Sequence, residues 1–532
     1  MKTKFLFWLA LFVYQANMSA QLFQWSFFVG GSGIESVEGA CKDQYETDFI
    51  SVGYYTSSDG DFTSVYGATD CFVQYYTMTF DLSWRTQFGG SDEDYLYDVK
   101  TFGDQIIAVG ASKSNDYDIT GNHGDFDYLV VKLDDAGNIL WQKSFGGSGE
   151  DVATSIVETS GGFLILGYSD STDGDITAGA NKGGFDLWLI KIDTDGNLLW
   201  QKNLGGSDDD KSGKIYNNVY TNTPDSFYIS AYSKSSDGDL TDNAGDYDFW
   251  LLSIDDNANI VWQKSYGGSG TDKEPALNYD MGMGLYVVGA SNSADGVVQN
   301  PKGDFDFLFL IVNENNGNLE MSANFGGSGA DYPTGIITFP MITRNIRYNP
   351  DVYIFGYSNS SDGDFATNQG GYDAWILGLD FSANIISQYN LGGSDDDILK
   401  GYESYLYTNQ FSSNNFVLYG NSKSNDGYLV GNHGDTDAWL WGAYLEYGNG
   451  IEQEKLIRIN SYPNPADTSV WIENKDIQEV SLTDETGREI LHYYIKSAVS
   501  LYRLDVSAVK TGNYFLKIRT KKGLGFKKIM IE

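Results

Sequence analysis

Acidic residues recur at three fixed positions along the sequence and offer most of the chemistry that its residue types allow. The first position lies five residues after the start of a repeated Gly-Gly-Ser motif and holds Glu35, Asp94, Asp151, Asp210, Asp272, Asp331 and Asp397. The second lies in a Ser-x-Asp-Gly-Asp loop motif and holds Asp59, Asp116, Asp173, Asp237, Asp295, Asp362 and Asp426. The third follows the second after 11 residues in six copies and 13 in one, and holds Asp70, Asp127, Asp186, Asp248, Asp306, Asp373 and Asp437.

Three carboxylates in each repeat could bind calcium, whose ligands are hard oxygen atoms. The candidate ligands in three consecutive repeats are Asp94, Asp116, Asp127, Asp151, Asp173, Asp186, Asp210, Asp237 and Asp248. The same residue types could instead accept hydrogen bonds from loop amides, as Asp does in turns. We favour the turn-forming interpretation. Calcium, which is the only cofactor that the pattern suggests, stays a hypothesis to test.

Catalytic residues have little support in this sequence. Its three histidines are His123, His433 and His492, and the first two lie in copies of Gly-Asn-His-Gly-Asp without a paired Cys or an activated Ser. Carboxylates are so frequent that their pairing says nothing specific about glycoside hydrolysis. The arginines between residues 21 and 450 are Arg85, Arg344 and Arg347, which are too few for a repeated anion-binding set. We therefore predict no catalytic residue.

The acidic positions belong to a long internal repeat. The Gly-Gly-Ser motif occurs seven times at spacings of 57 to 66 residues, and it begins at Gly30, Gly89, Gly146, Gly205, Gly267, Gly326 and Gly392. The copy at Gly146 contains four strand-like segments, residues 152–158, 163–168, 187–192 and 198–203, which we name strands A to D. Four antiparallel strands per repeat are typical of a propeller blade. The loops between D and A and between B and C, with all three acidic positions, then emerge on one face.

The phase of the repeats favours a closed ring. A D-type strand at residues 23–28 precedes the first motif, and the last copy ends on a C-type strand at 438–447 without a D strand after it. The N-terminal strand would complete the last blade and remove the open edges of the ring. We predict an all-β chain: a seven-bladed β-propeller over residues 21–447 with three-plus-one closure, followed by a small β-sandwich domain.

Tryptophan repeats with the same period. It stands five residues before the Gly-Gly-Ser motif at Trp25, Trp84, Trp141, Trp200 and Trp262. We expect these rings to pack between blades rather than to form a ligand platform. The two cysteines, Cys41 and Cys71, fall on the first and third strands of the first repeat, about 9–10 Å apart. A disulfide needs Cα atoms within about 7 Å, so we expect two unpaired thiols.

The N-terminus has the pattern of a secretory signal peptide at residues 1–20. Lys2 and Lys4 precede an apolar segment at residues 5–14, and Met18-Ser19-Ala20 suits cleavage before Gln21. No stretch is apolar for long enough to form a transmembrane segment. The pattern predicts export of the mature chain.

Charge is divided unevenly along the chain, whose formal net charge is −39. Residues 451–532 hold 11 of the 73 acidic and 13 of the 34 basic side chains, so residues 1–450 carry a net charge of −41. Such a field repels nucleic acid and anionic lipid and attracts cations or basic partners. We therefore exclude DNA and RNA as partners.

The last 75 residues, 458–532, follow a short linker at 448–457 and contain four motifs. In order, these are Tyr462-Pro463-Asn464-Pro465-Ala466, Asp484-Glu485-Thr486-Gly487-Arg488, Leu504-Asp505 to Gly512-Asn513-Tyr514-Phe515-Leu516, and Lys527-Lys528-Ile529-Met530-Ile531. Together they resemble the C-terminal (type A) sorting domain of the type IX secretion system of Bacteroidota. The resemblance implies a sandwich-like domain that the outer-membrane export machinery recognises, and a protein that is secreted or held at the outer cell surface. The repeats also resemble Gly-Gly-Ser propeller repeats of exported proteins of that phylum, which implies no activity.

These features predict an exported, non-catalytic propeller that functions in adhesion by binding an extracellular glycan or protein. Near-equivalent repeats suit multivalent binding. The alternatives are a glycoside-hydrolase-like enzyme on the same scaffold and a purely structural surface module. A hydrolase would place unlike loops around one cleft that holds a carboxyl group of perturbed pKa.

Overall fold

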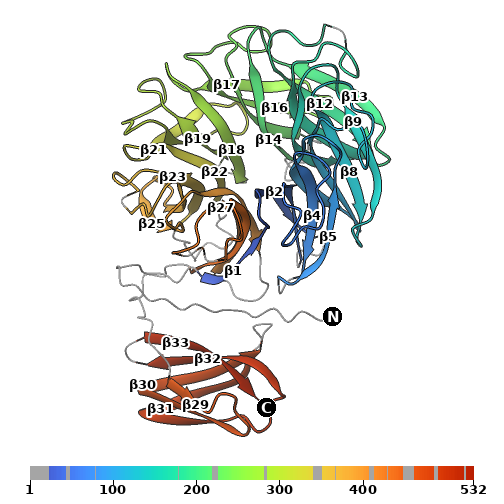
Figure 1. Cartoon of the computed structure of the whole chain (residues 1–532). Helices are drawn as coiled ribbons and strands as arrows, with labels where there is room; N and C mark the ends of the chain where they lie inside the picture. Colours follow the sequence, from blue (N-terminus) through green and yellow to red (C-terminus); the bar gives the residue numbers. More distant parts are fainter. Residues whose placement is uncertain are drawn as a thin grey trace. The chain divides into compact units, whose positions relative to one another are not determined.

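A computed structural model describes residues 23–43, 48–77, 80–177, 179–217, 226–280, 284–338, 350–365, 367–405, 413–427, 429, 431–446, 460–484, 489–520 and 523–531. The predicted signal peptide (1–20), the predicted linker (448–457) and Gly487 lie outside these ranges. The chain separates into two compact units, one over residues 20–449 and one that contains residues 450–532 (Figure 1). The described part contains no helix that could cross a membrane.

Seven four-stranded antiparallel sheets form the first unit, and we number them as blades in chain order. The strands of blades 1 to 3 are β2 (Glu35–Lys42), β3 (Phe49–Tyr55), β4 (Asp70–Tyr76), β5 (Leu82–Phe88), β6 (Asp94–Phe102), β7 (Gln105–Ser112), β8 (Asp127–Asp134), β9 (Ile139–Phe145), β10 (Asp151–Thr159), β11 (Gly162–Ser169), β12 (Asp186–Asp193) and β13 (Leu198–Leu204). Those of blades 4 to 6 are β14 (Asp210–Asn217), β15 (Ser226–Ser233), β16 (Asp248–Asp255), β17 (Ile260–Tyr266), β18 (Asp272–Asp280), β19 (Gly284–Ser291), β20 (Asp306–Val312), β21 (Leu319–Phe325), β22 (Asp331–Thr338), β23 (Val352–Ser358), β24 (Asp373–Leu379) and β25 (Ile385–Asn390).

Blade 7 combines the two ends of the repeat region. Its strands are β26 (Asp397–Tyr405), β27 (Ser413–Ser422), β28 (Asp437–Glu446) and the N-terminal β1 (Phe23–Val29). Strand β1 pairs antiparallel with β28, with Phe28 opposite Trp439 and Val29 opposite Ala438. The seven-bladed propeller and its three-plus-one closure are therefore confirmed.

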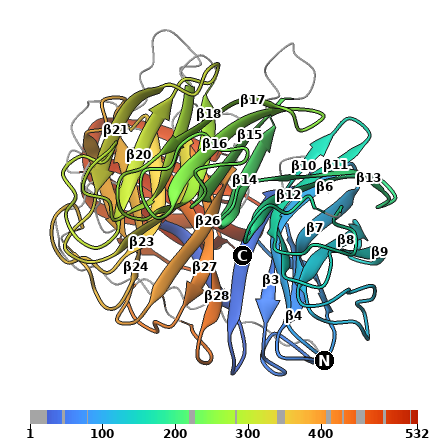
Figure 2. The ribbon, with the colours of Figure 1, turned by 90° about the horizontal axis from the view of Figure 1, so that it is seen from above.

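The first strand of each blade lies innermost, and the first strands contact one another all the way round the ring (Figures 1 and 2). Two ion pairs join β2 to β26 where the ring closes. Lys400 Nζ lies 3.0 Å from Glu38 Oε1, and Lys42 Nζ lies 3.7 Å from Glu403 Oε1. Closure is thus supported both by the β1–β28 strand pairing and by charges on the inner wall.

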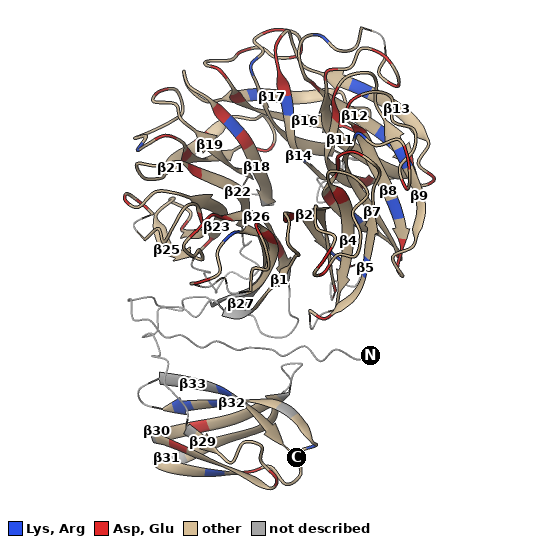
Figure 3. Ribbon diagram, viewed as in Figure 1, with Lys and Arg blue, Asp and Glu red and all other residues tan. Residues whose placement is uncertain are grey.

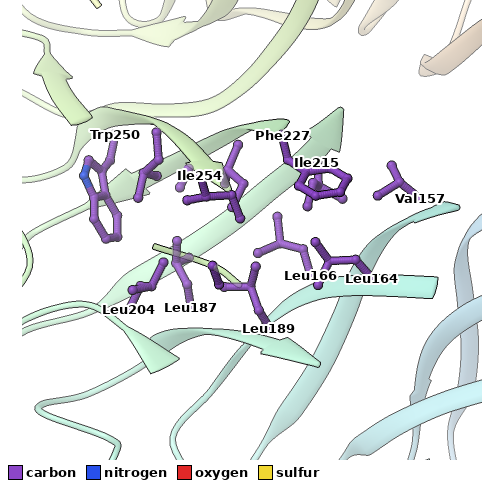
Figure 4. Packing of buried hydrophobic residues seen from close by; sticks show 14 of the residues in the cluster. Val157, Leu164, Leu166, Leu187, Leu189, Leu204, Ile215, Phe227, Trp250 and Ile254 are labelled. Carbon is purple, nitrogen blue, oxygen red and sulfur yellow. The ribbon is translucent and has the colours of Figure 1, made fainter. Parts of the chain in front are cut away.

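Apolar side chains fill the space between neighbouring blades. Figure 4 shows one such cluster, in which Leu166 and Leu189 of blade 3 meet Phe227 and Trp250 of blade 4. The Trp series that precedes the Gly-Gly-Ser motif packs at the outer end of these clusters. A Cβ at Gly137, whose φ is 82°, would lie 2.6 Å from the Trp84 ring of the preceding blade. The expected packing role is confirmed for the described members of the series.

Both cysteines belong to the packing cluster between blades 1 and 2. Cys41 is on β2 and Cys71 is on β4, with β3 between them in the sheet. Both are buried and free, so the expectation of two unpaired thiols is confirmed. Burial raises the pKa of both thiols, which disfavours the reactive thiolate.

The second unit is a small β domain of five strands. They are β29 (Asn460–Tyr462), β30 (Ser469–Asp484), β31 (Glu489–Asp505), β32 (Gly512–Thr520) and β33 (Gly523–Ile531). The long β30 pairs with β29, β31 and β32, and its register shifts at residues 473–479. Buried side chains from both halves of β30, such as Val470 and Val480, belong to one core cluster with Leu516 and Ile529. This arrangement agrees with the predicted small sandwich-like domain.

We predict that deleting residues 21–29 leaves the edge of β28 unpaired and makes the protein self-associate, because an open strand edge pairs with other chains. Size-exclusion chromatography with light scattering should show oligomers for the deletion variant, and its melting temperature should fall. The control is the chain that begins at residue 21. A monomeric deletion variant with unchanged melting would contradict the closure.

Candidate functional site

The first acidic position joins two loops on one face of each blade. Asp151 is fully buried, and its Oδ2 accepts hydrogen bonds from the Gly147 amide (2.7 Å) and the Ser171 hydroxyl (2.9 Å). The other six residues of the series accept from the equivalent glycine amide at 2.6–2.9 Å. Each carboxylate thereby holds the Gly-Gly-Ser loop against the loop between strands B and C.

The second acidic position binds the same Gly-Gly-Ser loop from outside. Asp173 Oδ1 accepts a hydrogen bond from the Ser148 amide at 2.7 Å. This bond recurs in all seven copies at 2.6–2.8 Å. The turn-forming interpretation therefore accounts for one oxygen of each of these residues.

The third acidic position belongs to the boundary between blades. Asp186 begins β12 and accepts a hydrogen bond on Oδ2 from the Lys182 amide at 2.8 Å. Its Oδ1 is buried and has no hydrogen-bond partner among the described residues, and the same holds for the other six members of the series. A Cβ at Gly205 would lie 2.3 Å from Asp186 Oδ1 and 2.6 Å from Oδ2 of Asp210 in the next blade. Two carboxyl groups from adjacent blades thus face one glycine.

Burial and mutual repulsion raise the pKa of these paired carboxyl groups. Burial is the main cause for Asp186, whose pKa rises to about 7, and Asp210 raises it further. The pKa of Asp127 and that of Asp151 rise to about 6, chiefly through burial. The pKa of the third acidic residue is raised at all seven boundaries.

The structure separates the three acidic positions that the sequence groups together. Asp151 and Asp173 hold the same loop, whereas Asp186 faces Asp210 of the next blade. Among the described residues, no three His, Cys, Asp or Glu side chains are placed to hold a metal ion. Calcium binding at the residues predicted from the sequence stays a prediction.

Two histidines contact the third acidic position. Nδ1 of His123 lies 2.6 Å from Asp127 Oδ2, and Nδ1 of His433 lies 2.7 Å from Asp437 Oδ2. Both rings are partly exposed, and both carboxylates are buried. Each histidine ring thus forms a hydrogen bond to a buried carboxyl group, and Lys182 stands at the equivalent sequence position of blade 3.

Aromatic rings and lysines border the acidic loops, and sequence reasoning missed them. Lys211 Nζ lies 4.1 Å from the centre of the Phe185 ring, Lys113 Nζ 4.3 Å from Phe126, and Lys234 Nζ 4.5 Å from Tyr247. These rings are half-buried. A signal was present, because an aromatic residue directly precedes the third acidic position in five copies: Phe126, Phe185, Tyr247, Phe305 and Tyr372. Figure 3 shows how acidic residues are distributed over the loops of every blade.

The motif residues of the C-terminal domain come together from its two ends. The Asn464 side chain accepts a hydrogen bond from the Met530 amide at 2.8 Å, and Lys527 Nζ donates to the Ser461 carbonyl at 3.1 Å. Tyr462 ends β29 and is followed by Pro463 and Pro465, Gly512 begins β32, and Lys528 lies on β33. The Tyr514 hydroxyl donates to the Lys510 carbonyl at 2.7 Å.

Comparison with protein families identifies this second unit. Residues 460–532 match the family described as the secretion system C-terminal sorting domain. The C-terminal domain is a type IX sorting domain. The sorting domain indicates export to the cell surface or release from the cell, and implies contact with the type IX secretion machinery.

Several solved structures show a distant similarity to this chain. The WD40 domain of Neurospora crassa Pan2 has 11% identity and a TM-score of 0.41, over 80% of this chain and 92% of that chain. A variant of Synechocystis apocarotenoid oxygenase has 14% identity and a TM-score of 0.35, over 70% and 93% of the two chains. Pyrococcus horikoshii acylaminoacyl peptidase has 9% identity and a TM-score of 0.35, over 83% and 58%. No curated protein matches the sequence.

We predict that the propeller is more stable at pH 5.5 than at pH 8. Folding raises the pKa of the boundary carboxyl groups. Their contribution to the free energy of unfolding is therefore greatest below their unfolded pKa, and it is lost as the pH rises through about 6–7. Asp186→Asn should raise the melting temperature at pH 8, since it removes a charge worth roughly 2–4 kcal/mol of destabilisation there. It also removes the negative charge that faces Asp210, while Lys182 keeps its pairing with Asp239.

Thermal melts at fixed ionic strength would check this prediction. Asp195→Asn is the matched control, because it removes an exposed charge from a hairpin of the same blade. Equal melting of the wild type at both pH values, or a less stable Asp186→Asn variant at pH 8, would contradict it.

We predict that deleting residues 458–532 leaves the propeller inside the cell envelope of a host with the export system, because the sorting domain is then missing. Surface labelling and cell fractionation would locate the protein. The matched control is Asp195→Asn, which changes one exposed side chain of the propeller and keeps the sorting domain. Undiminished surface exposure of the truncated chain would rule out the sorting role.

Proposed function

We propose that the propeller is a non-catalytic adhesion module that binds an extracellular glycan or protein after export through the sorting domain. The observation that carries the proposal is the equivalence of the seven boundaries. At each of them, the carboxylates on the loop face accept hydrogen bonds from the protein's own amides and hydroxyls. These bonds suit a rigid frame with several similar surfaces.

The pKa values of the boundary carboxyl groups are perturbed, which in an enzyme would suggest a catalytic acid. The Asp186 side chain, however, is fully buried, and Asp248 is only 2% exposed. A catalytic acid must reach the substrate within hydrogen-bond distance. Raised pKa values at all seven boundaries are better explained by burial in a repeated structure, which argues against a hydrolase.

The half-buried rings beside the acidic loops support a binding role. Aromatic side chains supply much of the contact energy at interfaces because they are large, rigid and partly polar. Tyr168, Phe185, Tyr247 and Tyr332 have this exposure and lie beside partly exposed lysines. The loop face of the propeller therefore offers both aromatic and charged groups to a ligand.

A binding screen tests the proposal. The chain without residues 1–20 should bind at least one glycan or surface protein saturably and leave it chemically unchanged. An arm with calcium and an arm with EDTA test the metal hypothesis. If the carboxylates bind calcium, it should raise the melting temperature, with dissociation constants of roughly 10⁻⁴–10⁻³ M, as in extracellular modules.

Mass spectrometry of the recovered ligand serves as the control for catalysis. Cleavage of the ligand would favour the hydrolase alternative. Failure to bind any ligand would favour a purely structural module. Equal melting with calcium, magnesium and EDTA would show that the acidic loops need no cation.

A further inference from the structure

One loop departs from the repeat at a position where the backbone demands glycine. In six copies of the Ser-x-Asp-Gly-Asp motif, a glycine directly follows the second acidic position. These glycines have φ between 62° and 69°, and they are Gly60, Gly174, Gly238, Gly296, Gly363 and Gly427. Blade 2 has Tyr117 there, with φ of 52°. A bulky side chain in this region is a clear exception to backbone preferences.

The loop that carries Tyr117 also lacks, in the described part of the chain, a hydrogen bond that four other copies have. In blades 3 and 4 the amide of the first Gly in Gly-Gly-Ser donates to the last Asp of Ser-x-Asp-Gly-Asp. The distances are 3.2 Å from Gly146 to Asp175 and 3.0 Å from Gly205 to Asp239. Among the described residues, Gly89 makes no such bond to Asp118. The backbone bond from Asp118 to Gly89 is 3.2 Å long, against 2.8 Å for Asp175 to Gly146. The positive φ of Tyr117 is therefore not offset by tighter bonding of its loop.

The Tyr117 side chain is 67% exposed, so it fills no core. Its ring stacks on Tyr66, which is 47% exposed, with ring centres 4.9 Å apart and planes inclined by 22°. Tyr66 comes from the equivalent loop of blade 1, where its amide donates to Asp70 at 2.7 Å. Two loops of adjacent blades thus present a pair of exposed rings on a fixed backbone.

The loop Gly89–Asp94 lies between the two tyrosine-bearing loops. The Ser91 amide donates to Asp116 on one side, and the Ala68 amide donates to the Asp92 carbonyl on the other. Asp116 and Asp118, which flank Tyr117 in the chain, are exposed, and so is Asp92, whose carbonyl accepts the Ala68 bond. The nearby cations are already paired, since Lys113 contacts Glu93 and Asp125, and Arg85 contacts Asp61. The surroundings of the ring pair therefore carry an excess of negative charge.

From this geometry we infer that Tyr66 and Tyr117 form a binding site for a cationic side chain of a partner protein, with an arginine of a basic segment as the best fit. The same face supplies the precedent, because Lys113, Lys211 and Lys234 each lie over an aromatic ring there. Guanidinium groups stack on aromatic faces and pair with carboxylates. This inference rests on the proposed binding function and names a ligand class and a site for it.

Tyr117→Gly is the decisive variant because it restores the residue of the other six copies. Its net charge equals that of the wild type, so any general attraction to the acidic surface is unchanged. The probe is an amidated eight-residue peptide of alternating Gly and Arg, compared with the same peptide in which Gln replaces Arg. Tyr494→Ala is the matched control, since it removes a 78% exposed tyrosine from the sorting domain.

For the full chain without residues 1–20, we expect the Arg peptide to bind about five- to tenfold more weakly to Tyr117→Gly than to the wild type. The Gln peptide should bind to neither, and Tyr494→Ala should bind the Arg peptide as the wild type does. The melting temperature of Tyr117→Gly should equal or exceed that of the wild type, because glycine adopts this φ without strain.

Four results would overturn the site. Equal affinity of wild type and Tyr117→Gly for the Arg peptide would show general charge attraction. A lower melting temperature of the variant would show that the ring pair is structural. Loss of a neutral oligosaccharide ligand, without loss of the peptide, would make the pair a sugar platform. If Tyr117→Gly retains every ligand found in the binding screen, the site fails and the proposed function stands.

Discussion

The buried carboxylate at the start of each inner strand is the interaction on which the propeller face depends. At Asp151 it accepts bonds from a loop amide and a serine hydroxyl, and such bonds to a charged acceptor are stronger than neutral ones. The loop approaches so closely that a Cβ at Gly147 would lie 2.5 Å from the Asp173 carbonyl oxygen. The Gly-Gly-Ser motif is therefore the sequence that lets backbone amides reach this carboxylate, and the position of the loop between strands B and C follows from it.

The same arrangement places a second carboxyl group in a less favourable position. Asp186 and its equivalents each leave one buried oxygen without a hydrogen-bond partner among the described residues. Unpaired buried charge is costly, so the group binds a proton more readily and its pKa rises. His123 and His433 offset part of this cost in two blades. The structure thus gains a close junction between blades and loses electrostatic stability as the pH rises.

Much of the fold could be predicted from the sequence because repetition fixes it. The phase of residues 23–28 relative to the first motif predicted the pairing of β1 with β28, and the strand positions of Cys41 and Cys71 predicted free thiols. The site was predicted only in part. Counting residues places Asp151 and Asp186 on one face, but it does not show that Asp186 faces Asp210 across a boundary. A lysine contacts an aromatic ring of a neighbouring segment only if both side chains point toward each other. The spacing of residues in the sequence does not give these directions.

Repetition also makes exceptions informative, because each position in one repeat can be compared with the same position in the six other repeats. Where the backbone of six loops has glycine at positive φ, a tyrosine at the seventh is not explained by local folding. It is not explained by packing, because the ring is mostly exposed. Backbone strain of this kind persists where the surrounding structure holds it, and it is found at ligand sites. In blade 2, the loop around Tyr117 is held by the side chain of Asp116, which still accepts a hydrogen bond from the Ser91 amide.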